Sequence, residues 1–548
     1  MNIKHLFLAL ISMMIAIFLM ACSNEESGTE TNNNVNDDSQ SESDSESNLT
    51  ESGLPIVKEK ITLDFFTAKS NLNVNEDWND LFLWKEYEEM TNIEINWVEQ
   101  VSQDELPEKR NLTLAGNNLP DVFYASNFSS IDLFKYGQQG VFIKLNDLIE
   151  DHAPNLNQFL EENPDVRKGL TFPDGNIYSL PTVVEEEFLS RRVAPYPWFH
   201  KEWLDNLKMD IPETTEEFYQ YLQAIRDNDL NGNGENDEIP HGGVNIDNLF
   251  NWLKGSFGIG QNGSSTYYES DPNGEGLRFI PTSEEYKELL TYMNMLYEEE
   301  LIQQNIFSIE WAQFMATAGE GKYGHVVHYE PSSTFGVDLG EDFYVGGSVL
   351  EGPNGHQTYA NITSPLVTVG NFVITNENPD PAATVRWLDF FYSDEGSKFI
   401  YMGIENETYE ITDDGEYVYV DEIESSTERD IAISKYLPWV GINPPGLSKL
   451  EYFQGSEGSP ASIKVTEKIE PYIPEEVWSN FTYTEEENNF LTSVGADIEK
   501  YVDEMRDQFI SGSVPFSEWD DYVNTLEEIG LEEYMEVQTE AYNRYSSN

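Results

Sequence analysis

The order of hydrophobic and polar residues predicts alternating strands and helices at the start of the chain. Period-two alternation indicates a half-buried strand, and apolar residues three to four apart indicate an amphipathic helix. The pattern predicts, in order, a strand at 61–65, a helix containing Leu81, Trp84 and Tyr87, a strand at 93–97, a helix at 105–115 and a strand at 121–124. Strands joined by helices of this length favour an α/β fold with a mainly parallel sheet covered by helices on both faces.

Two later segments are predicted to be helices of the core. One begins with Thr282 and Glu285, which fit a capping box, and continues as a single apolar stripe. The other follows Pro379 and is interrupted at Gly396. The glycine-rich stretch 255–276 is predicted to be a surface loop. Four tryptophans are assigned to the core: Trp78, Trp84, Trp97 and Trp387.

The first 22 residues resemble a bacterial lipoprotein signal. Residues 6–19 are almost wholly apolar, and Cys22, the only cysteine of the chain, follows Ala21. We expect cleavage of the signal peptide 1–21 and lipid on the Cys22 thiol, diacylglycerol with palmitate, which would anchor the protein on the extracellular face of the cell membrane. A plain signal peptide with a chance cysteine and an uncleaved anchor are the alternatives, although the apolar run is shorter than the roughly 20 residues that span a bilayer.

The charge balance is extremely acidic, because 30 Lys and Arg stand against 101 Asp and Glu, a formal net charge of −71. This balance argues against nucleic acid as a partner, since phosphate binding needs clustered cations. We interpret the acidic excess as halophilic adaptation of an extracellular surface, because about 1 M salt shortens the Debye length to about 3 Å. Residues 22–54 hold almost no large apolar side chain and are predicted to be a disordered acidic linker.

Several motifs in a fixed order carry a resemblance to a known family. They are the stretches 108–123 (EKRNLTLAGNNLPDVF), 136–148, 153–155, 172–181 (FPDGNIYSLP), 203–205, 212–218, 392–396 and 403–409. Together they resemble the family 1 extracellular solute-binding proteins of ABC importers, and they are similar to the large oligosaccharide-binding branch with alginate- and rhamnogalacturonan-type members.

This resemblance implies a two-lobed periplasmic-binding-protein type II fold with interlobe crossover strands and a ligand cleft, which closes on the ligand. Lobe 1 is expected to comprise residues 55–182 plus about 365–430, and lobe 2 residues 183–364 plus about 431–548.

The stretch 227–240 is a candidate calcium loop. Oxygen-bearing side chains at alternate positions surround one hard cation, and glycines permit the tight bend. One register starts at Asp227 and follows the EF-hand spacing as far as Glu238. The other resembles the structural calcium loop of the alginate-binding relatives, with the ligands Asp229, Asn231, Asn233, the Glu235 carbonyl, Asp237 and Glu238. We favour the second register and a structural Ca²⁺ over the alternative of an acidic turn.

A cleft for an oligosaccharide needs flat aromatic rings for the apolar faces of the sugars and polar groups for their hydroxyls. Ligands of α/β sheets bind at the carboxyl ends of strands, which nominates most of eight ligand-binding residues: Thr67, Lys69, Ser126, Asn127, Phe128, Tyr178, Trp311 and Trp439. Trp311 and Trp439 lie approximately where alginate-binding relatives place stacking tryptophans, and core packing is the alternative for each. Arg191 and Arg192 fit either a uronate carboxylate or neutralisation of the glutamates 185–187, which we favour slightly.

The resemblance therefore predicts the solute-binding component of an ABC transporter, a monomer without catalysis that captures an oligosaccharide and delivers it to the permease subunits. The alternatives are a surface polysaccharide-binding lipoprotein and a glycan-active enzyme with paired carboxylates. No nucleophile elbow, metalloprotease helix or phosphate-binding loop occurs in the sequence to support an enzyme.

Overall fold

The computed structural model describes residues 48–116, 118–274, 276–331, 335, 343–426 and 428–547. Cys22, the signal segment and the linker as far as residue 47 lie outside the described residues. No helix within the described part has the length and apolar content to cross a membrane. Residues 48–54, which the sequence assigns to the linker, are bonded to the folded chain, because Arg386 donates to the carbonyls of Thr50 (2.6 Å) and Gly53 (3.1 Å).

The larger sheet has six strands and contains the first predicted elements. Its spatial order is β14 (Gly446–Ser448), β4 (Leu180–Val184), β11 (Leu366–Ile374), β3 (Val122–Phe128), β1 (Ile61–Lys69) and β2 (Ile93–Ser102). Helices α3 (Phe82–Thr91) and α4 (Leu106–Ala115) connect β1, β2 and β3. All pairs are parallel except those of β11, which runs antiparallel to β3 and to β4. The predicted β-α-β-α-β order and the mainly parallel α/β sheet are therefore confirmed.

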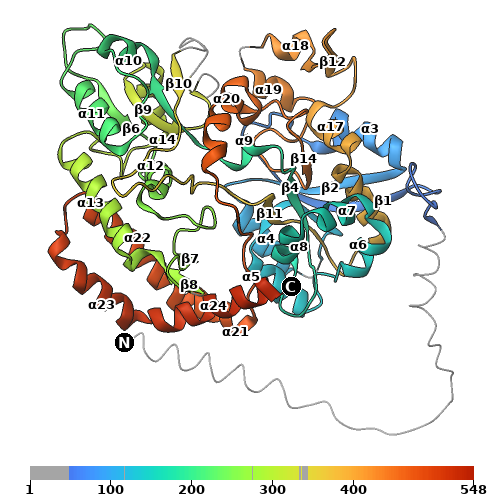
Figure 1. Ribbon diagram of the computed structural model, residues 1–548. Coiled ribbons are helices and arrows are strands. Elements are labelled where there is room, and N and C mark those ends of the chain that lie inside the picture. The colour runs from blue at the N-terminus through green and yellow to red at the C-terminus, as the bar shows by residue number, and fades with distance from the viewer. Residues whose placement is uncertain are drawn as a thin grey trace, which may run out of the picture. The chain divides into compact units, whose positions relative to one another are not determined.

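Further helices pack around this sheet (Figure 1). They are α5 (Ser130–Gln138), α6 (Asn146–His152), α7 (Pro154–Glu162), α8 (Pro164–Leu170), α16 (Pro381–Asp389), α17 (Asp394–Met402), α18 (Asp421–Glu424) and α19 (Arg429–Ser434), with the hairpin β12 (Tyr409–Ile411) and β13 (Tyr417–Tyr419). Helix α8 contacts β11 directly, and α16 contacts α6. The helices bury their apolar stripes in this way, as amphipathic helices on a sheet do.

The smaller sheet has four strands in the order β10 (Tyr344–Gly346), β5 (Tyr196–His200), β9 (Tyr323–His328) and β6 (Ile239–Gly242). The helices after β4 that remain are α9 (Leu189–Arg192), α10 (Lys201–Leu207), α11 (Thr215–Arg226), α12 (Asp247–Leu253), α13 (Glu284–Glu298), α14 (Trp311–Gly319), α20 (Pro460–Ile469), α21 (Glu485–Phe490), α22 (Ala496–Ile510), α23 (Trp519–Ile529) and α24 (Leu531–Ser547), with the hairpin β7 (Tyr268–Ser270) and β8 (Leu277–Phe279). Helix α11 begins with a complete capping box of Thr214 and Glu217.

Two large hydrophobic clusters divide the described chain. The first core draws residues from 56–188 and 366–453, and the second core from 193–362 and 465–534. The chain therefore passes between the cores at 188–193, 362–366 and 453–465. The stretch 432–453, which the sequence assigns to the second lobe, packs in the first core. Trp78, Trp84, Trp97 and Trp387 are buried in the first core as predicted.

Three local expectations are wrong. Helix α13 is capped by Ser283, whose hydroxyl accepts from the Tyr286 amide, instead of by a box at Thr282. The helix after Pro379 breaks at Ser393, which caps α17, so Gly396 lies inside that helix. The stretch 255–276 is largely folded into the protein, because the buried carboxylate of Glu269 pairs with the partly buried Arg278 (2.5 Å). The apolar-to-polar pattern does not show such internal neutralisation of charge.

Candidate functional site

The strands β1, β3 and β4 end at one edge of the larger sheet, which we call the carboxyl edge and define by Lys69, Phe128 and Val184. All three run in the same direction, because β1 is parallel to β3, and β11 is antiparallel to both β3 and β4. The chain leaves this edge after Val184 and enters the second core at Val193. The carboxyl edge therefore faces the segments that join the two cores.

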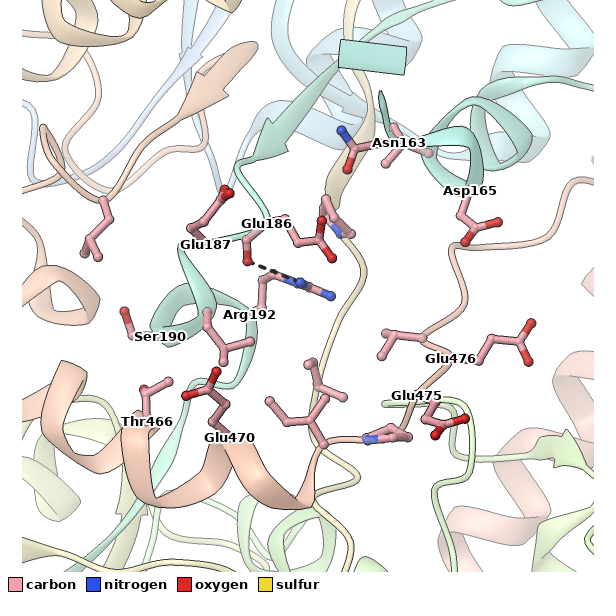
Figure 2. A pocket seen from close by; sticks show the side chains of 18 of the residues that line it. Asn163, Asp165, Glu186, Glu187, Ser190, Arg192, Thr466, Glu470, Glu475 and Glu476 are labelled. Carbon is pink, nitrogen blue, oxygen red and sulfur yellow. Dashed lines mark hydrogen bonds between the residues drawn. The ribbon is translucent and has the colours of Figure 1, made fainter. Parts of the chain in front are cut away.

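A pocket of about 860 Å³ lies at these joining segments (Figure 2). Eight carboxylate residues line it: Glu162, Asp165, Glu186, Glu187, Glu467, Glu470, Glu475 and Glu476. Among its described lining residues Arg192 is the one cation, and none of them is aromatic. Arg192 donates from Nε to the Thr363 carbonyl (3.0 Å). A terminal nitrogen of Arg192 donates to the Glu186 carbonyl (3.4 Å), the bond that Figure 2 marks. Its charge is therefore committed to the backbone, and the pocket keeps a strongly acidic character.

Aromatic rings gather on a different surface near the same segments. Trp311 is the first residue of α14 and is 51% exposed, with its ring 5.9 Å from that of His328. Tyr329 follows His328 and is 43% exposed. Burial raises the pKa of Tyr329; the charge of Glu457 adds to this rise, and that of Arg191 opposes it. We call Trp311, His328 and Tyr329 the aromatic face.

Arg191 connects this region to the carboxyl edge. Its guanidinium donates to Ser448 Oγ (3.0 Å) and to Asn443 Oδ1 (2.7 Å), and it lies 4.6 Å above the Phe453 ring. Within the described chain neither Arg191 nor Arg192 forms an ion pair with the glutamates 185–187. The charge of Glu186 still acts on Arg192 and opposes the lowering of its pKa by burial, so neutralisation of these glutamates stays a prediction. The two guanidinium groups hold the joining segments through uncharged oxygens.

Most of the nominated cleft residues are buried in this structure. The nearly inaccessible ones are Thr67, Ser126, Phe128, Tyr178 and Trp439. Thr67 and Ser126 donate to nearby backbone carbonyls, and Tyr178 donates to Asp174 (2.6 Å). These side chains therefore present little surface to a ligand.

Whereas Trp311 is exposed, Trp439 is buried. Its indole nitrogen donates to the Tyr401 carbonyl (3.1 Å), and its ring packs on Phe453 at 5.4 Å in the first core. Lys69 donates to the carbonyls of Asn75 (3.0 Å) and Glu76 (2.8 Å). Of the eight nominated residues, Trp311 and Asn127 have exposed side chains in this structure.

Three residues near Arg191 were not found from the sequence: Tyr329, Asn443 and Phe453. Asn443 precedes Pro444 and Pro445, which is a turn signal that the sequence does offer. Asn371 donates to the Asn443 carbonyl and to Thr182 Oγ1 (2.7 Å), so this turn is tied to β4 and β11. Nothing in the sequence pattern identifies Tyr329 or Phe453 among the 60 Tyr and Phe of the chain.

In the candidate calcium loop, amide groups of the loop donate hydrogen bonds to its own carboxylates. The two oxygens of Asp229 accept from the amides of Gly232 (2.8 Å) and Gly234 (2.9 Å), where φ is positive. Asn231 and Asn233 each donate to Asp237 Oδ1 at 2.8 Å. The Asp227 carboxylate pairs with the Arg226 guanidinium (2.8 Å).

Glu238 closes the loop. Its Oε1 accepts from the amides of Leu230 (2.7 Å) and Asn231 (2.9 Å), and its Oε2 is buried without a partner among the described residues. Lys322 pairs with Asp237 (3.0 Å) and, with both Asn amides, lowers the pKa of Asp237 to about 2. Within the described chain no three His, Cys, Asp or Glu side chains converge as a metal cluster.

The chain is similar to sugar-binding proteins of bacterial importers. A family model described as bacterial extracellular solute-binding protein matches residues 71–398. The fructooligosaccharide ABC transporter substrate-binding protein FusA of Streptococcus pneumoniae is 28% identical over 519 residues, 90% of this chain and 92% of FusA. In Bacillus subtilis, lipoprotein LipO is 24% identical over 82% of this chain and 86% of LipO. The polygalacturonan/rhamnogalacturonan-binding protein YtcQ of the same organism is 29% identical over 44% of this chain and 45% of YtcQ.

Solved structures show the same fold. FusA of S. pneumoniae in complex with kestose superposes with a TM-score of 0.73 at 26% identity, over 89% of this chain and all of that one. An EF-hand mutant of FusA in complex with fructo-nystose gives a TM-score of 0.72 at 25% identity, with the same coverage. The alginate-binding protein AlgQ2 shares the fold, with a TM-score of 0.68 at 21% identity over 89% of this chain and 99% of AlgQ2. These findings confirm the fold and the resemblance that the motifs indicate.

Proposed function

Since the chain belongs to the bacterial extracellular solute-binding protein family, we propose that it captures a neutral oligosaccharide between its two cores and delivers it to an ABC permease. The observation that carries the proposal is the position of the carboxyl edge, which lies at the three segments that join the two cores. Movement about such segments closes a cleft around a ligand. Similarity to FusA over most of both chains supports an oligosaccharide as the ligand.

The aromatic face supplies the groups that a sugar needs. The exposed ring of Trp311 offers an apolar surface for a sugar ring, and the neighbouring phenol of Tyr329 offers a hydrogen-bonding tip. The pocket of Figure 2 has no aromatic ring among its described lining residues, so we place the sugar on the aromatic face and not in that pocket.

A neutral sugar fits the charges better than a uronide. A polyuronide needs free cations, and bidentate arginine is the usual partner of a carboxylate. Arg191 is bonded to Ser448 and Asn443, and Arg192 to backbone carbonyls. The eight carboxylates of the nearby pocket would repel further negative charge. Repulsion and committed arginines both favour a neutral ligand.

Calorimetric titration tests the proposal. Kestose and nystose serve as neutral ligands, and trigalacturonate is the charged comparison of matched length. We expect binding of a neutral oligosaccharide and no heat from trigalacturonate. Binding of trigalacturonate alone would refute the neutral ligand, and the absence of binding across a broad oligosaccharide panel would refute the proposed function. Because relatives of this family are binding proteins, the bound sugar should be recovered uncleaved by chromatography after prolonged incubation.

We also propose that the loop 229–238 holds a structural Ca²⁺. The donor set fits a hard cation, because one short loop carries the carboxylates of Asp229 and Asp237 and the amide oxygens of Asn231 and Asn233, which accept from backbone amides of the same loop. The buried Oε2 of Glu238, which has no hydrogen-bond partner among the described residues, fits coordination of a cation. The existence of an EF-hand in FusA supports a calcium loop within this fold. Pairing of Asp227 with Arg226 favours the register that begins at Asp229.

For localisation, we propose a lipid anchor on Cys22 at the extracellular face of the membrane, with the protein acting as a monomer. Membership of an extracellular family supports the compartment, and similarity to lipoprotein LipO supports the anchor. A single anchored cysteine leaves no second cysteine for a disulfide, so stability rests on packing and on any bound ion.

A further inference from the structure

The end of β3 has an unusual backbone. Ala125 and Asn127 both have positive φ, 48° and 46°, although neither is glycine. Left-handed backbone is uncommon for residues with a Cβ, and asparagine tolerates it better than alanine. Such conformations persist only where the surroundings hold them, and they gather at functional sites. The two left-handed residues turn Ser126 inward, where it is fully buried, and Asn127 outward, where it is exposed.

Arg110 of α4 holds this backbone from the inside. One terminal nitrogen of its guanidinium donates to the Ser126 carbonyl and to the Asn127 carbonyl, both at 2.7 Å. The same guanidinium lies 4.6 Å from the centre of the Phe128 ring, and its side chain is 11% exposed. Burial lowers the pKa of Arg110, and Asp132, 3.8 Å away, opposes this effect. Arg110 therefore fixes two consecutive peptide groups with a single charged donor.

Close packing also holds the end of the strand. Gly370 of β11 pairs with Phe128, and a Cβ on Gly370 would overlap the Phe128 carbonyl oxygen. Directly after the strand, Ser129 caps α5 and donates to Asp132 (3.0 Å), the acidic neighbour of Arg110. The left-handed turn is thus held by the Arg110 guanidinium and is followed at once by the closely packed pair of Phe128 and Gly370.

The Asn127 amide is left exposed by this arrangement and has no hydrogen-bond partner among the described residues. It lies at the carboxyl edge, where the chain passes to the second core. We propose that Arg110 is a positioning residue, which holds the left-handed turn so that the Asn127 amide bonds a hydroxyl of the captured sugar. This inference rests on the proposed function.

A double-mutant cycle of Arg110→Gln and Asn127→Ala tests it, with affinity measured by calorimetry for whichever of kestose, nystose and trigalacturonate the wild type binds best. Loss of one neutral hydrogen bond corresponds to about threefold to tenfold in affinity. We expect this loss for Asn127→Ala and for Arg110→Gln, and we expect no further loss when Arg110→Gln is added to Asn127→Ala. Arg110→Lys should restore part of the affinity, because an ammonium still reaches one carbonyl.

Melting temperatures measured in parallel separate folding from positioning. If Arg110→Gln does not fold, Arg110→Lys takes its place in the cycle, and Asn127→Gly gives a second test because glycine adopts positive φ freely. Wild-type affinity in Asn127→Ala and Asn127→Gly would overturn the inference while leaving the proposed function intact. The inference would also be overturned if Arg110→Gln reduced the affinity by the same factor in the wild type and in the Asn127→Ala background. A wild type that binds no sugar would remove the proposed function and this inference together.

Discussion

Replacing two tryptophans separates sugar binding from core packing. Trp311 is 51% exposed on the aromatic face, and Trp439 is 6% exposed in the first core. A large aromatic side chain presents roughly 250 Å² when free, so about 125 Å² of Trp311 faces solvent. A sugar ring that covers half of this area gains about 1.5 kcal/mol at about 25 cal/mol per Å². Trp311→Ala should therefore weaken binding about tenfold, with little change in the free energy of unfolding.

Trp439→Ala is the matched control, because it removes the same side chain from a buried position. Its ring contacts Tyr401 (5.6 Å) and Phe453 (5.4 Å), and its indole donates to the Tyr401 carbonyl. Tryptophan-to-alanine changes in cores cost about 3–5 kcal/mol of stability. Both variants are assayed by calorimetry with kestose and by thermal melting. The assignment of Trp311 to the sugar and of Trp439 to the core would be refuted by the opposite result. In that case Trp311→Ala keeps the wild-type affinity, and Trp439→Ala loses binding with an unchanged melting temperature.

Four further predictions concern calcium binding, the lipid anchor, and the dependence of stability on salt and on pH. Chelation should lower the melting temperature and added Ca²⁺ should restore it, since a ligand at 100 times its Kd adds about 2.7 kcal/mol; Glu238→Gln should abolish this response, Asp227→Asn should keep it, and no calcium dependence in the wild type would refute the site. Cys22→Ser should not label with fatty acid, whereas a free Cys22 thiol in the native protein, seen by mass spectrometry, would exclude the anchor. The melting temperature should rise from low to molar salt, because screening reduces repulsion among the charges that sum to −71; a flat response would contradict this. Burial lowers the pKa values of His200, His241 and His328 to about 4, 3 and 4, so these histidines bind more protons in the unfolded chain below about pH 6.5, and their contribution to stability should fall as the pH drops from 6.5 towards 4. Denaturant midpoints at each pH measure this fall, which His328→Gln should reduce.

The fold was predictable because its signals are local and repeated. The strands β1 and β2 alternate in apolarity over several residues, β3 begins with a short apolar run, and the helix α3 carries an apolar stripe. Four of the aromatic residues in this part, including Trp84 and Trp97, pack against one another in the first core. Periodicity records which face of an element is buried, so it specifies the core well.

The cleft was less predictable because its side chains depend on backbone geometry that periodicity does not record. Strand topology directed attention to the residues at the end of β3, but the positive φ of Ala125 and Asn127 decides which side chains point outward. A left-handed turn without glycine has no compositional signal. Similarly, Arg191 and Arg192 are adjacent, yet one bonds Asn443 and Ser448, and the other bonds backbone carbonyls. Sequence alone does not separate these two directions.

The scarce cations near the carboxyl edge share one use. Lys69, Arg110, Arg191 and Arg192 donate mainly to uncharged oxygens of the backbone or of Asn and Ser side chains. Cations bound in this way shape the loops, but they leave most nearby carboxylates without a salt-bridge partner. The region therefore stays negative in a protein that has more than three acidic residues for each basic one. A surface of this kind repels anionic ligands, and under the proposed function it leaves stacking and neutral hydrogen bonds as the means of recognising a sugar.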